Sequence, residues 1–308
     1  MVNRVAEVLG VGRDAVYRRM RGDTVLATEE LLLLTAQYGI DLETLMEESN
    51  RASYYPTVPY RITSEVEFFE PLAQQAAYAG ALRDLSYRNI STELPLPYEL
   101  ALPTMRPFKI FMYGITSWGL SKWQDKPFAA NLIHPRALEL AGQFVRECFN
   151  HSGKDILSPG LFDNTLKQIT YMQEMGRFAD PNDVNRLLDE LLFIAAHLEK
   201  MSVLQQRYLP GDVLHDKSPT YQFYLNELPN ANNLLLLDSS QRRLQLTMTV
   251  SPNYIVTDNE DIVQQSSQWY DGILASSTLL GRGASKRTTV FFNKQRRKIE
   301  SARVMLLQ

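Results

Sequence analysis

Arginines at helical spacing are the first chemistry-bearing side chains in this 308-residue chain. A helix is predicted over residues 13–20, with Val16 and Met20 on its inner side. Its outer side and its surroundings carry arginine, aspartate and tyrosine. Side chains of these types can hydrogen-bond the edges of DNA bases or bind phosphate oxygens. We expect contacts to base edges from Arg13, Asp14, Tyr17 and Arg18, and contacts to phosphates from Arg4, Arg19 and Arg21.

Short helices on either side are expected to position this arginine-bearing helix. Residues 3–9 are amphipathic, and Gly10-Val11-Gly12 interrupts them, because glycine adopts left-handed backbone angles at a helix end. Thr28 is expected to cap a third helix that ends near Gly39, and a fourth helix is expected over residues 41–46. Two short helices joined by a three-residue turn are typical of a helix-turn-helix.

Charge is polarised along the same segment. Residues 1–24 hold five arginines against three acidic residues, whereas residues 25–48 hold six acidic residues and neither lysine nor arginine. A positive face backed by an acidic scaffold suits a polyanion. An ordinary helical hairpin with a solvated charged face has the same spacing, so spacing alone leaves both interpretations open.

Residues 5–46, VAEVLGVGRDAVYRRMRGDTVLATEELLLLTAQYGIDLETLM, resemble the Xre-type helix-turn-helix of the Cro and lambda-repressor superfamily. The resemblance implies a DNA-binding transcriptional regulator whose recognition helix, residues 13–20, lies in the major groove of double-stranded DNA. The sequence departs from the family at Gly12, where serine or threonine is usual. The helix that normally precedes residues 3–9 has no counterpart after Met1, so either the start of the chain is called late or the chain is a truncated form. We expect that difference to expose positions such as Val5, Val8 and Leu34.

The rest of the chain resembles bacterial regulators in which an Xre-type head precedes a long helical, then mixed, tail. The segments that carry this resemblance are FKIFMYGITSW, DNTLKQITYMQEMGRF, LLDELLFIAAHLEK, NELPNANNLLLLD and TTVFFNKQRRKIE. The resemblance assigns the tail no ligand. We expect the tail to serve dimerisation or the sensing of a small-molecule effector, and we expect a homodimer because two-fold symmetry pairs DNA half-sites.

The predicted fold class is α+β, mostly α, in four parts. These are a helix-turn-helix domain (residues 1–49) that lacks its first helix, a linker (50–63), a helical region (64–215) and an α+β region (216–308). The central helices are expected at 64–85, 135–149, 161–175 and 181–206, and the apolar segment 108–118 is expected to be buried. Strands at 221–228, 232–238 and 242–250 are expected to form a small antiparallel sheet, with helices at 259–280 and 285–307 after it.

Other residues with catalytic or ligand-binding chemistry form no recognisable set. His134, His151, His197 and His215 lack metal-ligand spacing, and His197 is expected to be a satisfied core histidine. Cys148 and His151 lie three residues apart but lack an orienting partner. Gly281 to Lys286 (GRGASK) lacks the phosphate-loop pattern. We therefore predict no enzyme activity, no metal and no cofactor.

The C-terminal segment is strongly basic. Residues 280–308 hold eight lysines and arginines against Glu300 alone. A solvated helix face that balances acidic residues elsewhere is slightly favoured. A second phosphate-contacting surface, or an interface with the acidic residues 29–48, remains open.

Composition excludes some classes of protein and some cellular compartments. A net charge of -3 excludes a uniformly basic nucleic-acid coat, and a single cysteine fits a reducing compartment. With no secretory or membrane-spanning segment in the sequence, we predict a cytoplasmic protein. The alternative to a DNA-binding regulator is a ligand-sensing or protein-interaction module whose head does not bind DNA.

Overall fold

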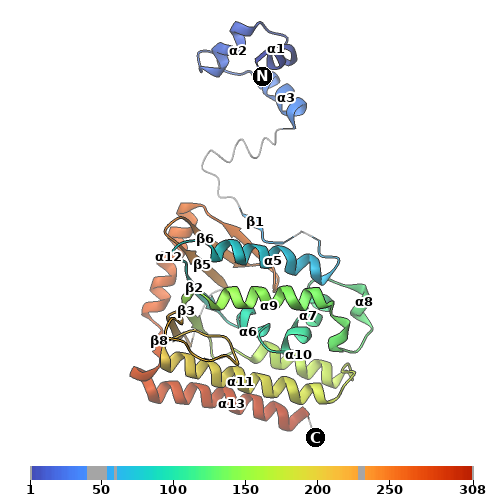
Figure 1. Cartoon of the computed structure of the whole chain (residues 1–308), viewed down its shortest axis with the longest axis vertical. Coiled ribbons are helices and arrows are strands. Elements are labelled where there is room, and N and C mark those ends of the chain that lie inside the picture. Colours follow the sequence, from blue (N-terminus) through green and yellow to red (C-terminus); the bar gives the residue numbers. More distant parts are fainter. Residues whose placement is uncertain (1, 40–53, 59–60, 228–232, 307–308) are drawn as a thin grey trace. The chain divides into compact units, whose positions relative to one another are not determined.

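The chain divides into two compact units, which we call the head (Met1–Ser53) and the body (Tyr54–Gln308) (Figure 1). The computed structural model describes residues 2–39, 54–58, 61–227 and 233–306. The described part of the head is helical, and the body is an α+β unit built on one mixed sheet.

Three short helices make up the described part of the head: α1 (Val2–Leu9), α2 (Arg13–Met20) and α3 (Thr28–Tyr38). Gly10 leaves α1 with a φ of 63°, as the predicted break requires. The expected cap at Thr28 is wrong, because Thr28 is already helical and Glu30 accepts the Ala27 backbone N–H at 3.1 Å instead. The fourth helix expected at residues 41–46 lies outside the described residues.

The body contains an eight-stranded sheet in the order β1-β7-β6-β5-β2-β3-β4-β8. The three strands β2, β3 and β4 run parallel, and every other neighbouring pair is antiparallel. The strands are β1 (Tyr55–Pro56), β2 (Ser86–Ser91), β3 (Ser152–Leu157), β4 (Tyr221–Leu225), β5 (Leu234–Asp238), β6 (Arg243–Met248), β7 (Tyr254–Thr257) and β8 (Thr278–Leu280).

The small antiparallel sheet expected from the sequence is therefore wrong in size and topology. The expected strands exist as β4, β5 and β6, but β2 and β3 lie between β4 and β5. Both of these central strands come from the region expected to be helical. Their sequences, SYRNIS and SGKDIL, place buried polar residues such as Asn89 and Asp155 where apolar alternation would have indicated strands. β1 and β8 likewise occupy parts of the expected linker and of an expected helix.

Most predicted helices of the body are confirmed, with α9 starting and ending as expected and α11 starting one residue late. The segment expected to be buried forms α7, whose residues from Pro107 to Gly114 are all buried. The helices are α5 (Glu65–Gly80), α6 (Leu96–Glu99), α7 (Met105–Thr116), α8 (Ser121–Gln124), α9 (Pro135–Phe149), α10 (Asp163–Glu174), α11 (Asn182–Leu204), α12 (Glu260–Ala275) and α13 (Ser285–Leu306).

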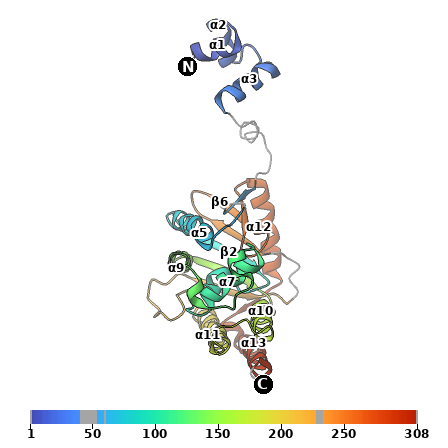
Figure 2. The same cartoon turned by 90° about the vertical axis from the view of Figure 1, so that its right-hand side faces the viewer.

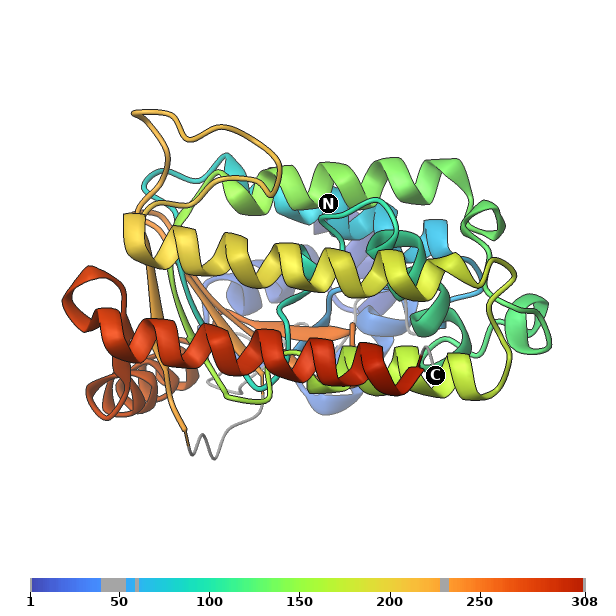
Figure 3. The ribbon, with the colours of Figure 1, turned by 90° about the horizontal axis from the view of Figure 1, so that it is seen from below.

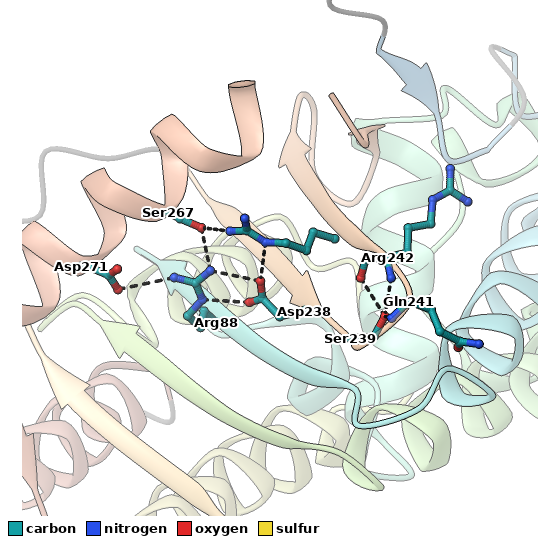
Figure 4. A network of polar contacts seen from close by, with 8 residues as sticks. Arg88, Asp238, Ser239, Gln241, Arg242, Ser267 and Asp271 are labelled. Carbon is teal, nitrogen blue, oxygen red and sulfur yellow. Dashed lines mark hydrogen bonds and ion pairs between the residues drawn. The ribbon is translucent and has the colours of Figure 1, made fainter. Parts of the chain in front are cut away.

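Helices cover both faces of the sheet. α12 lies on one face, where Tyr270 packs against Ile90, Ile156 and Leu236 (Figure 2). α5 and α9 lie over the opposite face, and α11 and α13 run side by side along it (Figure 3). Arg88 of β2 anchors α12, because it donates to Asp238 of β5 at 2.9 Å and to Ser267 of α12 at 2.7 Å (Figure 4).

Candidate functional site

The exposed side of α2 carries the residues predicted to contact bases. Arg13, Asp14 and Arg18 are exposed, and Tyr17 is 47% exposed. Val16 is the inner residue that the sequence predicted, at 2% exposure, but Met20 is 65% exposed and does not pack inward. The four polar side chains therefore form an accessible row on one helix, and Arg4 of α1 is also exposed.

The two other predicted phosphate contacts already have partners in the head. Arg19 donates to both carboxylate oxygens of Glu30, at 2.9 and 2.7 Å, and to the Ala15 carbonyl at 3.1 Å. This bidentate pair joins α2 to α3, so Arg19 has a structural role. Arg21 pairs with Asp23 at 2.9 Å, but both side chains are more than half exposed. Such a pair is weak, and a phosphate can replace the carboxylate.

The described part of the head buries little apolar surface. Among its described residues only Val16 is buried, while Val5, Val8 and Leu34 are partly buried. Leu32 and Leu33 of α3 are each about half exposed, at 52% and 51%. The described part of the head therefore has a much smaller apolar core than the body.

The basic C-terminal helix packs into the body. α13 buries Phe291, Phe292 and Ile299, and its cations pair with acids of α10 and α11. These pairs are Arg296 with Glu199 (2.7 Å), Lys298 with Asp163 (2.7 Å) and Arg303 with Asp189 (2.5 Å). This supports the favoured interpretation of a helix face balanced by acids elsewhere. Lys294 and Arg297 are exposed.

The structure gives two of the histidines local roles. His197 is 6% exposed and its Nε2 hydrogen-bonds the Tyr208 carbonyl at 2.9 Å, as expected of a satisfied core histidine. Burial lowers the pKa of His197 to about 4. His134 caps α9, where its Nδ1 accepts the Arg136 N–H. His215 is exposed. The described residues contain no group of three or more His, Cys, Asp or Glu side chains arranged to hold a metal ion.

The glycine-rich segment from Gly281 to Lys286 has a packing role. Gly281 adopts a φ of 150°, and a Cβ there would lie 2.7 Å from the Ser202 carbonyl oxygen. Its N–H donates to Thr288 Oγ1 at 2.8 Å, so that donor is not free for a phosphate. The segment joins β8 to α13.

A cavity of about 540 Å³ lies in the body between the sheet and helices α5, α6 and α9. The sequence predicted effector sensing in this part of the chain but did not identify these lining residues. Its walls are mostly apolar under β5, β6 and β7, where Leu235, Leu237, Leu244 and Leu246 face inward. Polar side chains gather under β2 and β3. Exposed residues Gln74, Tyr78 and Arg242 also line the cavity, so it reaches the surface along α5.

Asp155 of β3 organises the polar end of this cavity. Its carboxylate is 1% exposed and accepts three hydrogen bonds, from Asn89 Nδ2 (2.9 Å), Tyr221 Oη (2.9 Å) and Tyr87 Oη (3.3 Å). Burial raises the pKa of Asp155, opposed by Arg207 and by these hydrogen bonds. Tyr87 reaches Asp155 because it lies over Gly153, where a Cβ would come within 1.9 Å of the ring.

Arg207 lies beside this carboxylate and is 4% exposed. Its guanidinium carbon lies 4.4 Å from the centre of the Tyr87 ring and 4.6 Å from that of Phe149. Its Nε has no hydrogen-bond partner, and among the described residues no carboxylate lies within 4.0 Å of its nitrogens. Arginine has five N–H donors and stays protonated. Arg207 is therefore a buried cation that packs against aromatic rings and has an N–H donor without a hydrogen-bond partner.

Cys148 and His151 line the same cavity. Burial raises the pKa of the Cys148 thiol to about 12, so the reactive thiolate is scarce at neutral pH. Burial, together with the charge of Arg207, lowers the pKa of His151, whose buried Nε2 has no hydrogen-bond partner. The pair therefore offers a neutral imidazole and a neutral thiol at the cavity wall.

No family model, curated protein or solved structure matches this chain. None of the helices in the described part of the chain is both long and apolar enough to cross a membrane. The function of the chain is therefore inferred from its own residues.

Proposed function

We propose that this chain is a DNA-binding transcriptional regulator of the Xre type, acting in the cytoplasm as a homodimer. In this proposal α2 enters the major groove of double-stranded DNA, and the body serves dimerisation and effector sensing. The observation that carries it is the row of exposed polar side chains on α2, directly after the glycine turn at Gly10.

Charge and geometry support this role for the head. α2 presents Arg13, Arg18 and Tyr17 on one accessible side, and Arg19 uses its own charge to fix α2 against α3. A helix of this kind, held by a second helix and carrying arginines outward, is how helix-turn-helix proteins read base edges.

Fluorescence anisotropy with a duplex of random sequence tests the proposal on the full chain. We expect micromolar binding at low salt that falls steeply as salt rises. Arg21→Ala should weaken binding to all duplexes about equally and lower the salt slope by about 1. Arg18→Ala should instead relax the preference among duplexes selected from a random pool. No binding at low salt would rule out the proposal.

The basic helix α13 requires its own control, because truncation would remove buried core residues. Lys294→Gln combined with Arg297→Gln neutralises two exposed cations and leaves the ion pairs of α13 intact. If this double variant binds DNA as the parent does, Lys294 and Arg297 do not contact phosphates.

A second candidate function is a sensor or interaction module whose head does not bind DNA. The exposed Leu32 and Leu33 of α3, and the small apolar core of the described head, favour it. The same titration separates the two functions, because this alternative predicts no salt-dependent binding by a folded chain.

A further inference from the structure

We propose that the cavity under α5 binds a small apolar monocarboxylate, with Arg207 holding the carboxylate and the leucines of β5 and β6 holding the apolar part. This binding does not depend on the head. A role for the ligand as the effector of a DNA-binding regulator rests on the proposed function.

The size and lining of the cavity fit a small molecule. Ligand pockets commonly measure about 300–1,000 Å³ and combine apolar walls with a few polar groups that fix orientation. This one measures about 540 Å³, and its lining follows the order of the sheet. Polar residues lie under β2 and β3 at one end, and leucines lie under β5 and β6 at the other.

The group without a partner at the polar end is a donor. Asp155 already accepts hydrogen bonds from Asn89, Tyr87 and Tyr221, so its carboxylate is not the group that lacks a partner. Arg207 has the opposite deficit, since its buried Nε lacks an acceptor. An uncompensated buried donor is costly, and a carboxylate satisfies a guanidinium with two parallel hydrogen bonds.

The surroundings of Arg207 hold its guanidinium in place before any ligand enters. The rings of Tyr87 and Phe149 lie 4.4 and 4.6 Å from it, and its backbone N–H donates to the Pro219 carbonyl at 2.8 Å. The other arginine that lines the cavity, Arg242, is exposed and paired with Asp258. Arg207 is therefore the anchor that the geometry selects.

Isothermal titration calorimetry on the full chain without DNA tests this inference. The probes are n-alkanoates of eight to twelve carbons and biphenyl-4-carboxylate, each compared with the alcohol of the same skeleton. We expect at least one acid to bind about 10- to 100-fold more tightly than its alcohol, as a charge-assisted hydrogen bond allows. Arg207→Gln should abolish this preference, and Arg136→Gln, at an exposed arginine that does not line the cavity, should keep it.

A matched pair on α5 controls for folding. Ala76 lines the cavity, whereas its neighbour Ala77 is exposed and does not. Ala76→Phe should fill the apolar end and weaken binding of the best acid at least about 10-fold, while Ala77→Phe should leave it unchanged. This pair keeps the test decisive if Arg207→Gln fails to fold.

Three results would overturn the inference. They are no binding by any acid, equal binding of acid and alcohol, and a folded Arg207→Gln variant that keeps the preference. Because DNA is absent, none of these results bears on whether the head reads DNA. Conversely, failure of the DNA titration would leave the cavity a ligand site without a regulated DNA contact.

Discussion

The arginines proposed to bind a partner are placed in opposite ways in the head and in the body. In the head, Arg13 and Arg18 stand on the outside of one helix, positioned by residues within a few turns of sequence. In the body, Arg207 lies inside a cavity formed by residues from 57 to 256 of the sequence. An exposed cation is available to a large polyanion, whereas a buried cation selects a ligand small enough to enter. The same side chain therefore suits two kinds of partner, and burial decides which.

The ion pairs that join helices in the two units also differ in how deeply they are buried. Glu99 and Lys109 form a buried pair in the body at 2.5 Å, with side-chain exposures of 5% and 1%. Arg19 and Glu30 form the corresponding pair in the head and are partly exposed, at 18% and 16%. Tryptophans 118, 123 and 269 all belong to the body, so tryptophan fluorescence follows that unit.

The largest expected effect comes from breaking the buried pair. Lys109→Met leaves the Glu99 carboxylate buried without its cation and should destabilise the body by about 3–5 kcal/mol. Urea unfolding monitored by tryptophan fluorescence measures this. Adding Glu99→Gln should recover part of the loss because it removes the uncompensated charge. Arg136→Met, which breaks the exposed pair with Glu139, should change little. Equal effects of Lys109→Met and Arg136→Met would contradict the comparison.

A smaller loss of stability is expected from a substitution at Gly153 of β3, where the Tyr87 ring packs. Gly153→Ala places a methyl group within 1.9 Å of the buried Tyr87 ring and should cost about 2–3 kcal/mol in the same unfolding assay. It should also disturb the hydrogen bond from Tyr87 to Asp155. Gly272→Ala on α12 is the matched control, since nothing lies within 4 Å of its added methyl group. That change should be neutral or stabilising by up to about 1 kcal/mol. A stable Gly153→Ala variant would mean that Tyr87 can move freely.

His197 makes the body sensitive to acid. Its pKa is about 4 in the folded chain, below the ordinary value of 6.5, so the unfolded chain takes up the proton first as pH falls. The free energy of unfolding is therefore unaffected by this group above pH 6.5, and it falls by about 3 kcal/mol between pH 6.5 and 4. His197→Gln should flatten this part of the unfolding profile, while His215→Gln, at an exposed position, should not. An unchanged slope in His197→Gln would assign the acid sensitivity to other groups.

The smallest effect is expected in the head. The hydrogen bonds from Arg19 and from the Ala27 backbone lower the pKa of Glu30. Their stabilisation is therefore present above the ordinary carboxyl pKa and is lost as pH falls through the lowered one. Glu30→Gln should speed amide hydrogen exchange in α2 and α3 without changing exchange in the body. Glu29→Gln on the same helix is the control. Unchanged exchange in α2 would show that the pair does not hold that helix.

Local signals predicted the elements of the fold better than their assembly. The start of α11 was predicted to within one residue, and there the Asp180 carboxylate accepts the Asn182 N–H at 2.9 Å. The strands β2 and β3 were missed because the side chains that form the polar cluster, Asn89 and Asp155, replace the apolar residues expected on a buried strand face. A polar residue inside a sheet breaks the pattern that reveals the strand.

The sequence by itself therefore determined the long helices and the row of polar side chains on α2. Each depends on neighbours within a few turns, where spacing and glycine positions suffice. Tertiary structure alone decided that β2 and β3 separate β4 from β5, and that Arg207 comes beside Asp155, Tyr87 and Phe149. Those residues lie far apart in the chain, and only the burial of apolar side chains on both faces of one sheet brings them together.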